Sequence, residues 1–225
     1  YTADPRVVPN AHKMTEITYD EMLEMASLGA KVLHSRCVEI AKKYGVELLV
    51  CSSLNHNSGT IVREKTKMEK MLISGVAADK NVAKIRVAGL GNDPESTFRL
   101  LNLLDRNNLN IDVMIQSLGK DGTKSVSFTV AKPDMLRTID VLNDNKDSLG
   151  IKKLDYDENV AKISVIGAGV RSHSGVAAKM FGALANAGIN TEMITTSEIR
   201  ITALIDEAYA DQAMRAIHET FLERV

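Results

Sequence analysis

One stretch of the sequence is used twice. Residues 82–117 and 160–197 both open with Val-Ala-Lys-Ile, and each continues through an alternating apolar strand, a glycine-containing turn, an amphipathic helix and a second strand. The turn in the second copy is longer than the turn in the first. A repeat of this length indicates two copies of one folding unit, which constrains the fold more than any other feature of the chain.

The elements around the first copy predict a ferredoxin-like unit. In order, they are a strand at 83–90, a helix from Pro94 capped by Asp93, strands at 110–117 and 123–130, a helix from Pro133 to about Asn145, and a strand at 151–156. The buried face of the first helix is expected to carry Phe98, Leu100, Leu101, Leu103 and Leu104. The order β-α-β-β-α-β is the ferredoxin-like plan.

The second copy lacks its fourth strand. Its expected elements are a strand at 161–166, a helix at 175–187, strands at 191–197 and 199–205, and a helix at about 208–222. A missing strand leaves part of a sheet uncovered. Residues 71–78 form the nearest unassigned strand, so we expect them to complete the second unit. The first unit would then be nested within the second, and hydrogen bonds from 71–78 to the first unit alone would contradict this.

The residues before the repeats predict a different kind of structure. Thr18 and Glu21 form a capping box for a helix that runs to Leu28, and Ser35–Tyr44 predicts a second helix that ends at Gly45. The second helix is expected to turn Val38, Ile40 and Ala41 inward. Residues 46–51 predict a buried strand, and residues 61–70, which are charged, predict a connector.

Composition excludes several classes of function. The net charge is −1, so nothing suggests a surface for nucleic acid or anionic membrane. No apolar run approaches the ~18 residues of a transmembrane helix. Cys37 and Cys51 are the only cysteines, and their spacing is typical of buried thiols in a reducing compartment. The histidines form no metal-binding pair, so we expect no metal site. The first residues are polar and punctuated by proline, unlike a signal peptide, so we expect a cytoplasmic location.

Both copies place a turn between a strand end and a helix N-terminus. The turns are Asn-Asp-Pro-Glu-Ser-Thr at 92–97 and Gly-Val-Arg-Ser-His-Ser-Gly at 169–175. Backbone amides and the helix dipole at such places can bind an anion, for instance the carboxylate of an amino acid. A simple strand-to-helix turn remains the alternative interpretation. An amide and an acid recur where the next strand begins, at 110–112 and 190–192, and such a carboxylate could accept an ammonium group.

The sequence shows no catalytic constellation. Gly167-Ala168-Gly169 resembles the start of a dinucleotide-binding fingerprint, but Ser172 stands where that pattern requires glycine.

Several stretches together resemble the aspartate kinase family. They are YTADPR, GAKVLHSRCVEIAKKYGVELLVCSS, the NSGT turn, NIDVMIQS, and the run from ISVIGAG through RSHSG to TTSEIRITALI. The resemblance covers the entire chain but only the C-terminal part of such an enzyme, because the Lys-Phe-Gly-Gly stretch that opens the kinase domain is absent. It implies an α+β fold with two ferredoxin-like (βαββαβ, ACT) units, one nested in the other, preceded by the C-terminal piece of an α/β amino-acid-kinase fold.

The resemblance also implies a division into domains. Residues 1–65 would be the end of the kinase domain, and 66–225 the regulatory region. Within the regulatory region, the first ACT unit would span 82–157, and the second would combine 70–80 with 158–225.

The resemblance implies ATP-dependent phosphorylation of L-aspartate in the intact enzyme, with Mg²⁺, and feedback inhibition by lysine, threonine or both. The fragment itself would hold no catalytic residue, no metal and no cofactor. Homodimers or higher oligomers would form through the ACT units. Three residues would touch ATP: Tyr1, Arg6 and Lys31. The effector would contact Asn92, Asp93, Pro94, Glu95, Ser96, Thr97, Asn110, Ile111, Asp112, Gln116, Val176, Ala177, Asn190, Thr191, Ser197 and Glu198.

Two departures from the family pattern leave the effector's identity open. Glu95-Ser96-Thr97 stands where Gly-Glu-Ala or a similar sequence is common, and Ser174 replaces a usual proline. Two alternatives to a kinase region also stay open. They are a free-standing amino-acid-binding regulator and a separately translated regulatory subunit.

Overall fold

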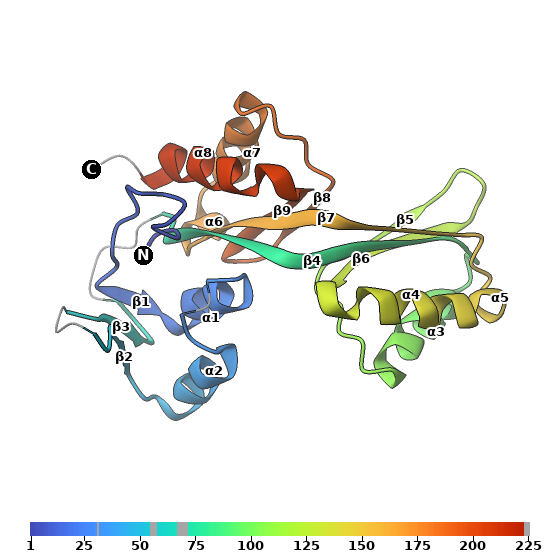
Figure 1. Ribbon diagram of the computed structural model, residues 1–225, viewed down its shortest axis with the longest axis horizontal. Coiled ribbons are helices and arrows are strands. Elements are labelled where there is room, and N and C mark those ends of the chain that lie inside the picture. Colours follow the sequence, from blue (N-terminus) through green and yellow to red (C-terminus); the bar gives the residue numbers. More distant parts are fainter. Residues whose placement is uncertain (31, 55–57, 67–71, 223–225) are drawn as a thin grey trace. The chain divides into compact units, whose positions relative to one another are not determined.

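The computed structural model describes residues 1–30, 32–54, 58–66 and 72–222 (Figure 1). The chain forms two compact units. Unit 1 comprises residues 1–80 and 161–225, and unit 2 comprises residues 81–160. Two long strands, β4 (Gly75–Leu90) and β7 (Lys153–Ile166), contribute residues to both units. The α+β class predicted from the sequence is confirmed.

Unit 2 has the ferredoxin-like order predicted for the first copy. Its strands are neighbours in the order β5 (Met114–Leu118), β6 (Lys124–Ala131), β4 and β7. Its helices are α3 (Pro94–Arg106), α4 (Met135–Asp144) and the short α5 (Lys146–Leu149), with a 3₁₀ turn η1 at Lys132–Asp134. Alternate residues of β4 and β6 pack against α3 and α4 in one core, whose central members include Ile85, Val87, Phe128, Leu100 and Leu104.

Unit 1 contains the second copy. Its strands are neighbours in the order β4, β7, β9 (Arg200–Asp206) and β8 (Met193–Thr196). The helices α7 (Val176–Asn186) and α8 (Ala210–Leu222) lie together on one face of these strands (Figure 1). A short helix α6 (Gly169–Ser172) precedes α7, and the 3₁₀ turn η2 (Glu207–Tyr209) precedes α8.

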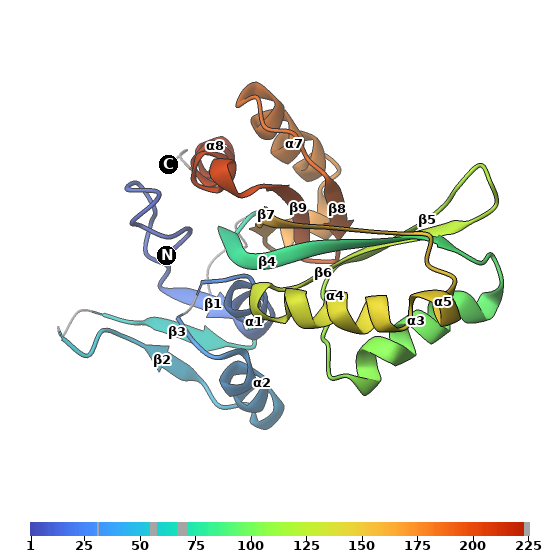
Figure 2. The same cartoon turned by 45° about the vertical axis from the view of Figure 1, so that its right-hand side comes forward.

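The N-terminal part of unit 1 has its own sheet. The strands β1 (Glu16–Thr18), β3 (Thr60–Arg63) and β2 (Leu48–Val50) lie in that order, with β1 and β3 parallel. The helices α1 (Tyr19–Ser27) and α2 (Ser35–Tyr44) lie beside this sheet, as Figure 2 shows. Ala77 of β4 and Ile166 of β7 join the same core as α1, so the N-terminal part and the second copy pack together.

The start of β4 is hydrogen-bonded within unit 1. The Ser74 amide donates to the Ile166 carbonyl at 2.8 Å, and the Val76 amide donates to the Thr2 carbonyl at 2.8 Å. Met71, the first residue of the expected strand, lies outside the described residues. Pairing of residues 71–78 with the first copy alone would have contradicted nesting. The described residues of this stretch instead bond to Ile166 of the second copy.

Two pairs of expected strands are each one continuous strand. The prediction ended one strand at residue 78 and began the next at residue 83, but β4 runs through both. It likewise separated 151–156 from 161–166, which β7 joins. Where β4 continues past residue 78, Asp79 forms an ion pair of 3.2 Å with Lys162 of β7, and both side chains are largely buried. Pairing of the charges lets the strand stay extended at a polar position.

The N-terminal elements correct four further predictions. Residues 61–70 are not only a connector, because β3 is the central strand of its sheet. Residues 46–51 are not a buried strand, because β2 is at the edge of that sheet and Leu49 is 66% exposed. Ile40 is exposed on α2 although Val38 and Ala41 are buried. Cys37 and Cys51 are exposed free thiols rather than buried ones.

Phe98 is a comparable error on α3. It was expected on the buried face but is 65% exposed, whereas Leu100 and Leu104 are fully buried. Both capped helix starts were predicted correctly: Thr18 and Glu21 form the capping box of α1, and Asp93 caps α3. Within the described residues, no helix is both long and apolar enough to cross a membrane.

Candidate functional site

A cavity of about 270 Å³ lies in unit 1 among residues of the expected nucleotide site. Tyr1, Arg6, Ala30 and Val32 line it. Lys31, the third residue expected to touch ATP, lies outside the described residues, although its neighbours on both sides face the cavity.

Arg6 is held at the rim by an acidic neighbour. Its guanidinium forms a 2.7 Å ion pair with Asp4, which also accepts the Arg6 backbone amide at 2.9 Å. The hydrogen bonds from Arg6 hold the pKa of the Asp4 carboxyl below its ordinary value. The Arg6 side chain is 88% exposed, so its remaining N–H donors face solvent and could bind a phosphate group.

Gly29 explains how the turn after α1 approaches the rest of unit 1. Its φ is +96°, a left-handed conformation that favours glycine, and a Cβ there would lie 2.6 Å from the Ala78 carbonyl oxygen. The backbone at Gly29 therefore packs directly on β4, and any larger residue at this position would push the two apart.

The turn in unit 2 provides its own anion. One oxygen of the Asp93 side chain accepts the backbone amides of Glu95 and Ser96 at 3.0 and 2.9 Å, and the other accepts the Ser96 hydroxyl. These hydrogen bonds lower the pKa of the Asp93 carboxyl, and the bond from the Ser96 hydroxyl has the largest effect. The first amides of α3 thus already donate to a carboxylate of the chain.

Of the other expected effector residues of unit 2, Thr97 and Gln116 are in contact. The Thr97 hydroxyl donates to the Gln116 side-chain oxygen at 2.6 Å, so α3 and β5 are bridged. Asn110, Ile111 and Asp112 precede β5 instead of opening it; the Asp112 amide donates to the Thr129 carbonyl at 3.1 Å. Asn92 and Pro94 flank Asp93 in the turn.

The turn in unit 1 is open by comparison. The N-cap residue of α7 is Gly175, which offers no side-chain cap, and a cavity of about 320 Å³ lies beside it. Ser172, His173, Gly175, Val176 and Lys179 line this cavity. The Val176 side chain is buried in the core with α8, so only its backbone could meet a ligand. Ala177, also expected to contact the effector, is exposed one residue later.

The remaining expected residues lie around β8. Asn190 and Thr191 precede it, and the Ser197 amide donates to the Arg200 carbonyl at 2.7 Å in the turn to β9. Glu198 pairs with Arg171 of α6 at 3.0 Å, and both side chains are more than 70% exposed. Sequence reasoning missed Arg171, although its position in Arg-Ser-His-Ser-Gly was a usable signal.

Two more contacts that the sequence did not predict tie α1 to the second copy. Arg200 of β9 pairs with Glu24 of α1 at 2.9 Å, with both side chains about three-quarters buried. The Ser74 hydroxyl donates to Glu21 at 2.5 Å. The sequence gives no signal for either contact, because the partners are far apart in the chain. Among the described residues, no group of three or more His, Cys, Asp or Glu side chains could hold a metal ion.

Comparisons with known proteins fit this layout. The amino acid kinase family model matches residues 1–52, and the ACT domain model matches residues 163–221. The regulatory subunit of aspartate kinase from Thermus thermophilus is 33% identical, and the match covers 67% of this chain and 99% of that chain with a TM-score of 0.63. The chain belongs to the aspartokinase family.

Longer family members match almost all of the chain. The aspartokinase of Pseudomonas aeruginosa is 42% identical over 98% of this chain and 54% of its own length. E. coli aspartokinase III is 27% identical and has been solved with aspartate and ADP (R-state), with a TM-score of 0.87, and with lysine and aspartate (T-state), with a TM-score of 0.81. The first match covers 99% of this chain and 50% of that chain, and the second covers 99% and 49%. The chain therefore spans about half the length of the curated relatives that it matches.

Proposed function

We propose that the intact protein is an aspartate kinase and that this chain is mainly its regulatory region. In the reaction, a side-chain carboxylate oxygen of L-aspartate attacks the γ-phosphorus of ATP, and the bond from that phosphorus to the β,γ-bridging oxygen breaks. The products are 4-phospho-L-aspartate and ADP. The observation that carries this proposal is an amino-acid-kinase segment followed, in one chain, by an ACT domain. No catalytic residue is assigned to the chain, so alone it should be inactive.

The domain boundaries form part of the same proposal. Residues 1–65 complete the kinase domain, residues 82–157 form the first ACT unit, and 70–80 with 158–225 form the second. The hydrogen bond from Ser74 to Ile166 and the two-segment composition of unit 1 support this nesting.

The nucleotide would bind at the 270 Å³ cavity. Tyr1 and Arg6 line it, Lys31 lies between two lining residues, and the exposed donors of Arg6 suit a phosphate. Mg²⁺ would accompany ATP and neutralise charge on its phosphates. E. coli aspartokinase III, which has this fold, has been solved with aspartate and ADP.

The effector would be lysine, threonine or both. The T-state structure of E. coli aspartokinase III is a complex with lysine and aspartate, and the ACT domain model matches residues 163–221 of this chain. In this chain, the α7 N-terminus would bind the effector's carboxylate, because Gly175 supplies no competing side chain. The α3 N-terminus is different, since Asp93 must leave before a second carboxylate could take its place.

Regulation would follow from unequal affinity for two states. The effector, bound where ACT units of two chains meet, would favour a less active form of the kinase. For a site at the first copy, its ammonium would lie near Asp112 or a backbone carbonyl. A ligand shifts such an equilibrium only by its difference in affinity for the two forms. A tenfold difference corresponds to ~1.4 kcal/mol, which one charge-assisted hydrogen bond can supply.

The wider setting is proposed on the same basis. The product would enter the synthesis of lysine, threonine, methionine and diaminopimelate in the cytoplasm, and the protein would be at least a homodimer. The second candidate is a regulatory subunit without a kinase of its own, since this chain is similar to the regulatory subunit of aspartate kinase from Thermus thermophilus. The kinase-family match at residues 1–52 favours the first candidate, because that subunit match covers only 67% of this chain.

The deciding experiment measures ADP formation by the intact protein with L-aspartate, and repeats it with lysine, threonine and both. We expect aspartate-dependent ADP formation that at least one of the two amino acids inhibits. ADP formation that does not depend on aspartate would overturn the kinase proposal. Uninhibited activity would overturn only the regulatory one.

A further inference from the structure

The cavity beside Tyr1 and Arg6 has a floor that the kinase segment does not supply. Val76, Ala77 and Ala78 of β4 and Met214 of α8 line it, and all four lie beyond residues 1–65. The floor is apolar, whereas Asp4 and Arg6 at the rim are charged. Apolar side chains beside an exposed cation suit a purine base whose phosphates extend outward.

Backbone contacts hold β4 against the kinase segment. The Val76 amide donates to the Thr2 carbonyl at 2.8 Å. A Cβ at Gly75 would lie 2.9 Å from that same carbonyl oxygen and 2.3 Å from Met25, and Gly29 approaches Ala78 equally closely. Two glycines therefore let the strand pass directly beneath both nucleotide-binding stretches.

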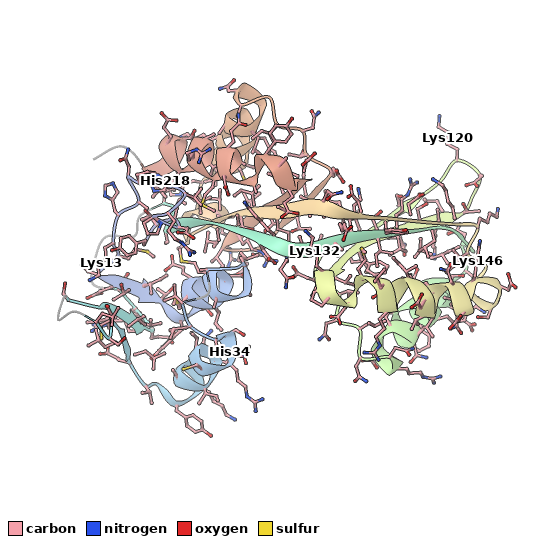
Figure 3. The ribbon with its side chains drawn as sticks, viewed as in Figure 1. Lys13, His34, Lys120, Lys132, Lys146 and His218 are labelled. Carbon is pink, nitrogen blue, oxygen red and sulfur yellow. The ribbon has the colours of Figure 1, made fainter. Side chains whose placement is uncertain are left out.

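A buried hydrogen bond places Met214 in the floor. His218, one turn further along α8, is fully buried and bonds through Nε2 to the Thr2 hydroxyl at 2.9 Å. Figure 3 shows His218 directed from α8 towards the N-terminal segment. Residues four apart lie on one face of a helix, so Met214 faces the same segment and reaches the cavity.

We propose that the regulatory region completes the nucleotide pocket and that Met214 is a specificity-determining residue that contacts the purine base. This inference rests on the proposed binding of ATP beside Tyr1 and Arg6. Methionine is polarisable and packs favourably against aromatic rings. At about 270 Å³ the cavity is near the lower end of ligand-site volumes, so it holds the base while the triphosphate extends past Arg6.

The floor also connects the nucleotide to the second copy. Met214 belongs to the same buried cluster as Val176 and Met180 of α7.

The test uses the intact kinase with Met214→Ala and a matched control, Met180→Ala. Both methionines are buried in one cluster, but only Met214 lines the cavity. We expect Met214→Ala to raise the KM for ATP about three- to tenfold, the effect of losing one apolar contact with a substrate, and to leave the KM for aspartate unchanged. Met180→Ala should change neither KM by more than about twofold, and Met214→Leu should restore most of the ATP affinity. Equal ATP KM values for the two alanine variants would overturn the proposal.

A second measurement needs no variant. A photoreactive azido-adenine nucleotide, cross-linked to the wild-type kinase and digested with trypsin, should label a peptide that contains Ala78 or Met214. Labelling confined to other peptides would overturn the proposal. Arg6→Ala separates the role of Met214 from the proposed ATP site on which it rests. If Arg6→Ala leaves the KM for ATP unchanged, the proposed nucleotide site itself is wrong. If Arg6→Ala raises the KM while Met214→Ala does not, only the role of Met214 fails.

Discussion

The two strand-to-helix turns arise from one repeated plan but have opposite chemistry. In unit 2, Asp93 caps α3 and already occupies the first amides of the helix. In unit 1, Gly175 leaves α7 without a side-chain cap, and a cavity of about 320 Å³ lies beside it. The comparison teaches that a repeated fold need not give repeated sites. A single carboxylate at the N-cap decides whether the helix binds its own chain or has room for a ligand.

The largest expected effect comes from giving α7 the cap that α3 has. A Cβ at Gly175 would meet no heavy atom within 4 Å, so Gly175→Asp fits, and its carboxylate should compete with the effector's carboxylate. We expect the concentration of effector needed for half-inhibition of the intact kinase to rise about tenfold or more. Gly175→Ala is the control, because it adds the side chain without charge. Equal inhibition of the two variants would show that the α7 turn does not bind the carboxylate.

The reverse change removes the cap from α3. Asp93→Ala leaves the Glu95 and Ser96 amides without their acceptor, and we expect the thermal unfolding temperature to fall by a few degrees. Asp134→Ala is a matched control, since Asp134 precedes α4 without capping it. Hydrogen exchange should quicken at Glu95 and Ser96 in the first variant only. Unchanged exchange there would mean that Asp93 is not what satisfies the α3 amides.

Two ion pairs of unit 1 should differ in strength according to burial. Arg200 and Glu24 are about three-quarters buried, and we expect a double-mutant cycle with Arg200→Met and Glu24→Gln to give a coupling of about 1 kcal/mol. Arg171 and Glu198 are mostly exposed, and their cycle should give about 0–0.5 kcal/mol. Chemical denaturation measures both. A stronger coupling for the exposed pair would contradict the assignment of Arg200 as the contact that holds α1.

The smallest effect is a pH dependence confined to the α3 turn. The pKa of Asp93 is lowered in the folded state, so the stability from this cap is present above about pH 4 and is lost as the pH falls through the lowered pKa. Asp93→Asn keeps an acceptor that does not titrate. Thermal unfolding of wild type and Asp93→Asn should therefore converge or cross on acidification. Parallel profiles down to strongly acidic pH would show that the carboxylate is not ionised in the cap.

Much of the architecture followed from local patterns in the sequence. The repeat, the capping signals at Thr18 and Asp93, and the Gly45 stop each act over a few residues, and the structure confirms them. Errors arose where the extent or the burial of a strand depends on residues far away in the sequence. The predicted strand ended at residue 78, but Asp79 continues β4 and pairs with Lys162 of β7. Residues 46–51 were expected to form a buried strand, but β2 lies at the edge of its sheet, which depends on its pairing with β3.

The candidate sites were less accessible from the sequence. The position of both turns at helix N-termini suggested that each could bind a carboxylate. The sequence also predicted Asp93 as the cap of its helix, and the geometry shows that this carboxylate accepts the Glu95 and Ser96 amides. Met214 looked like any apolar residue on a helix, since nothing in its neighbours reveals that α8 reaches the segment around Thr2.

The most direct test is titration calorimetry of the intact kinase with L-lysine, L-threonine, both together, and L-methionine as a control, each repeated with the corresponding amino acid amide. Our account predicts that lysine or threonine binds, that methionine does not, and that replacing the carboxylate by an amide abolishes most of the affinity. Equal binding of the acid and its amide, or no binding by either amino acid, would contradict an effector site at the uncapped α7 N-terminus.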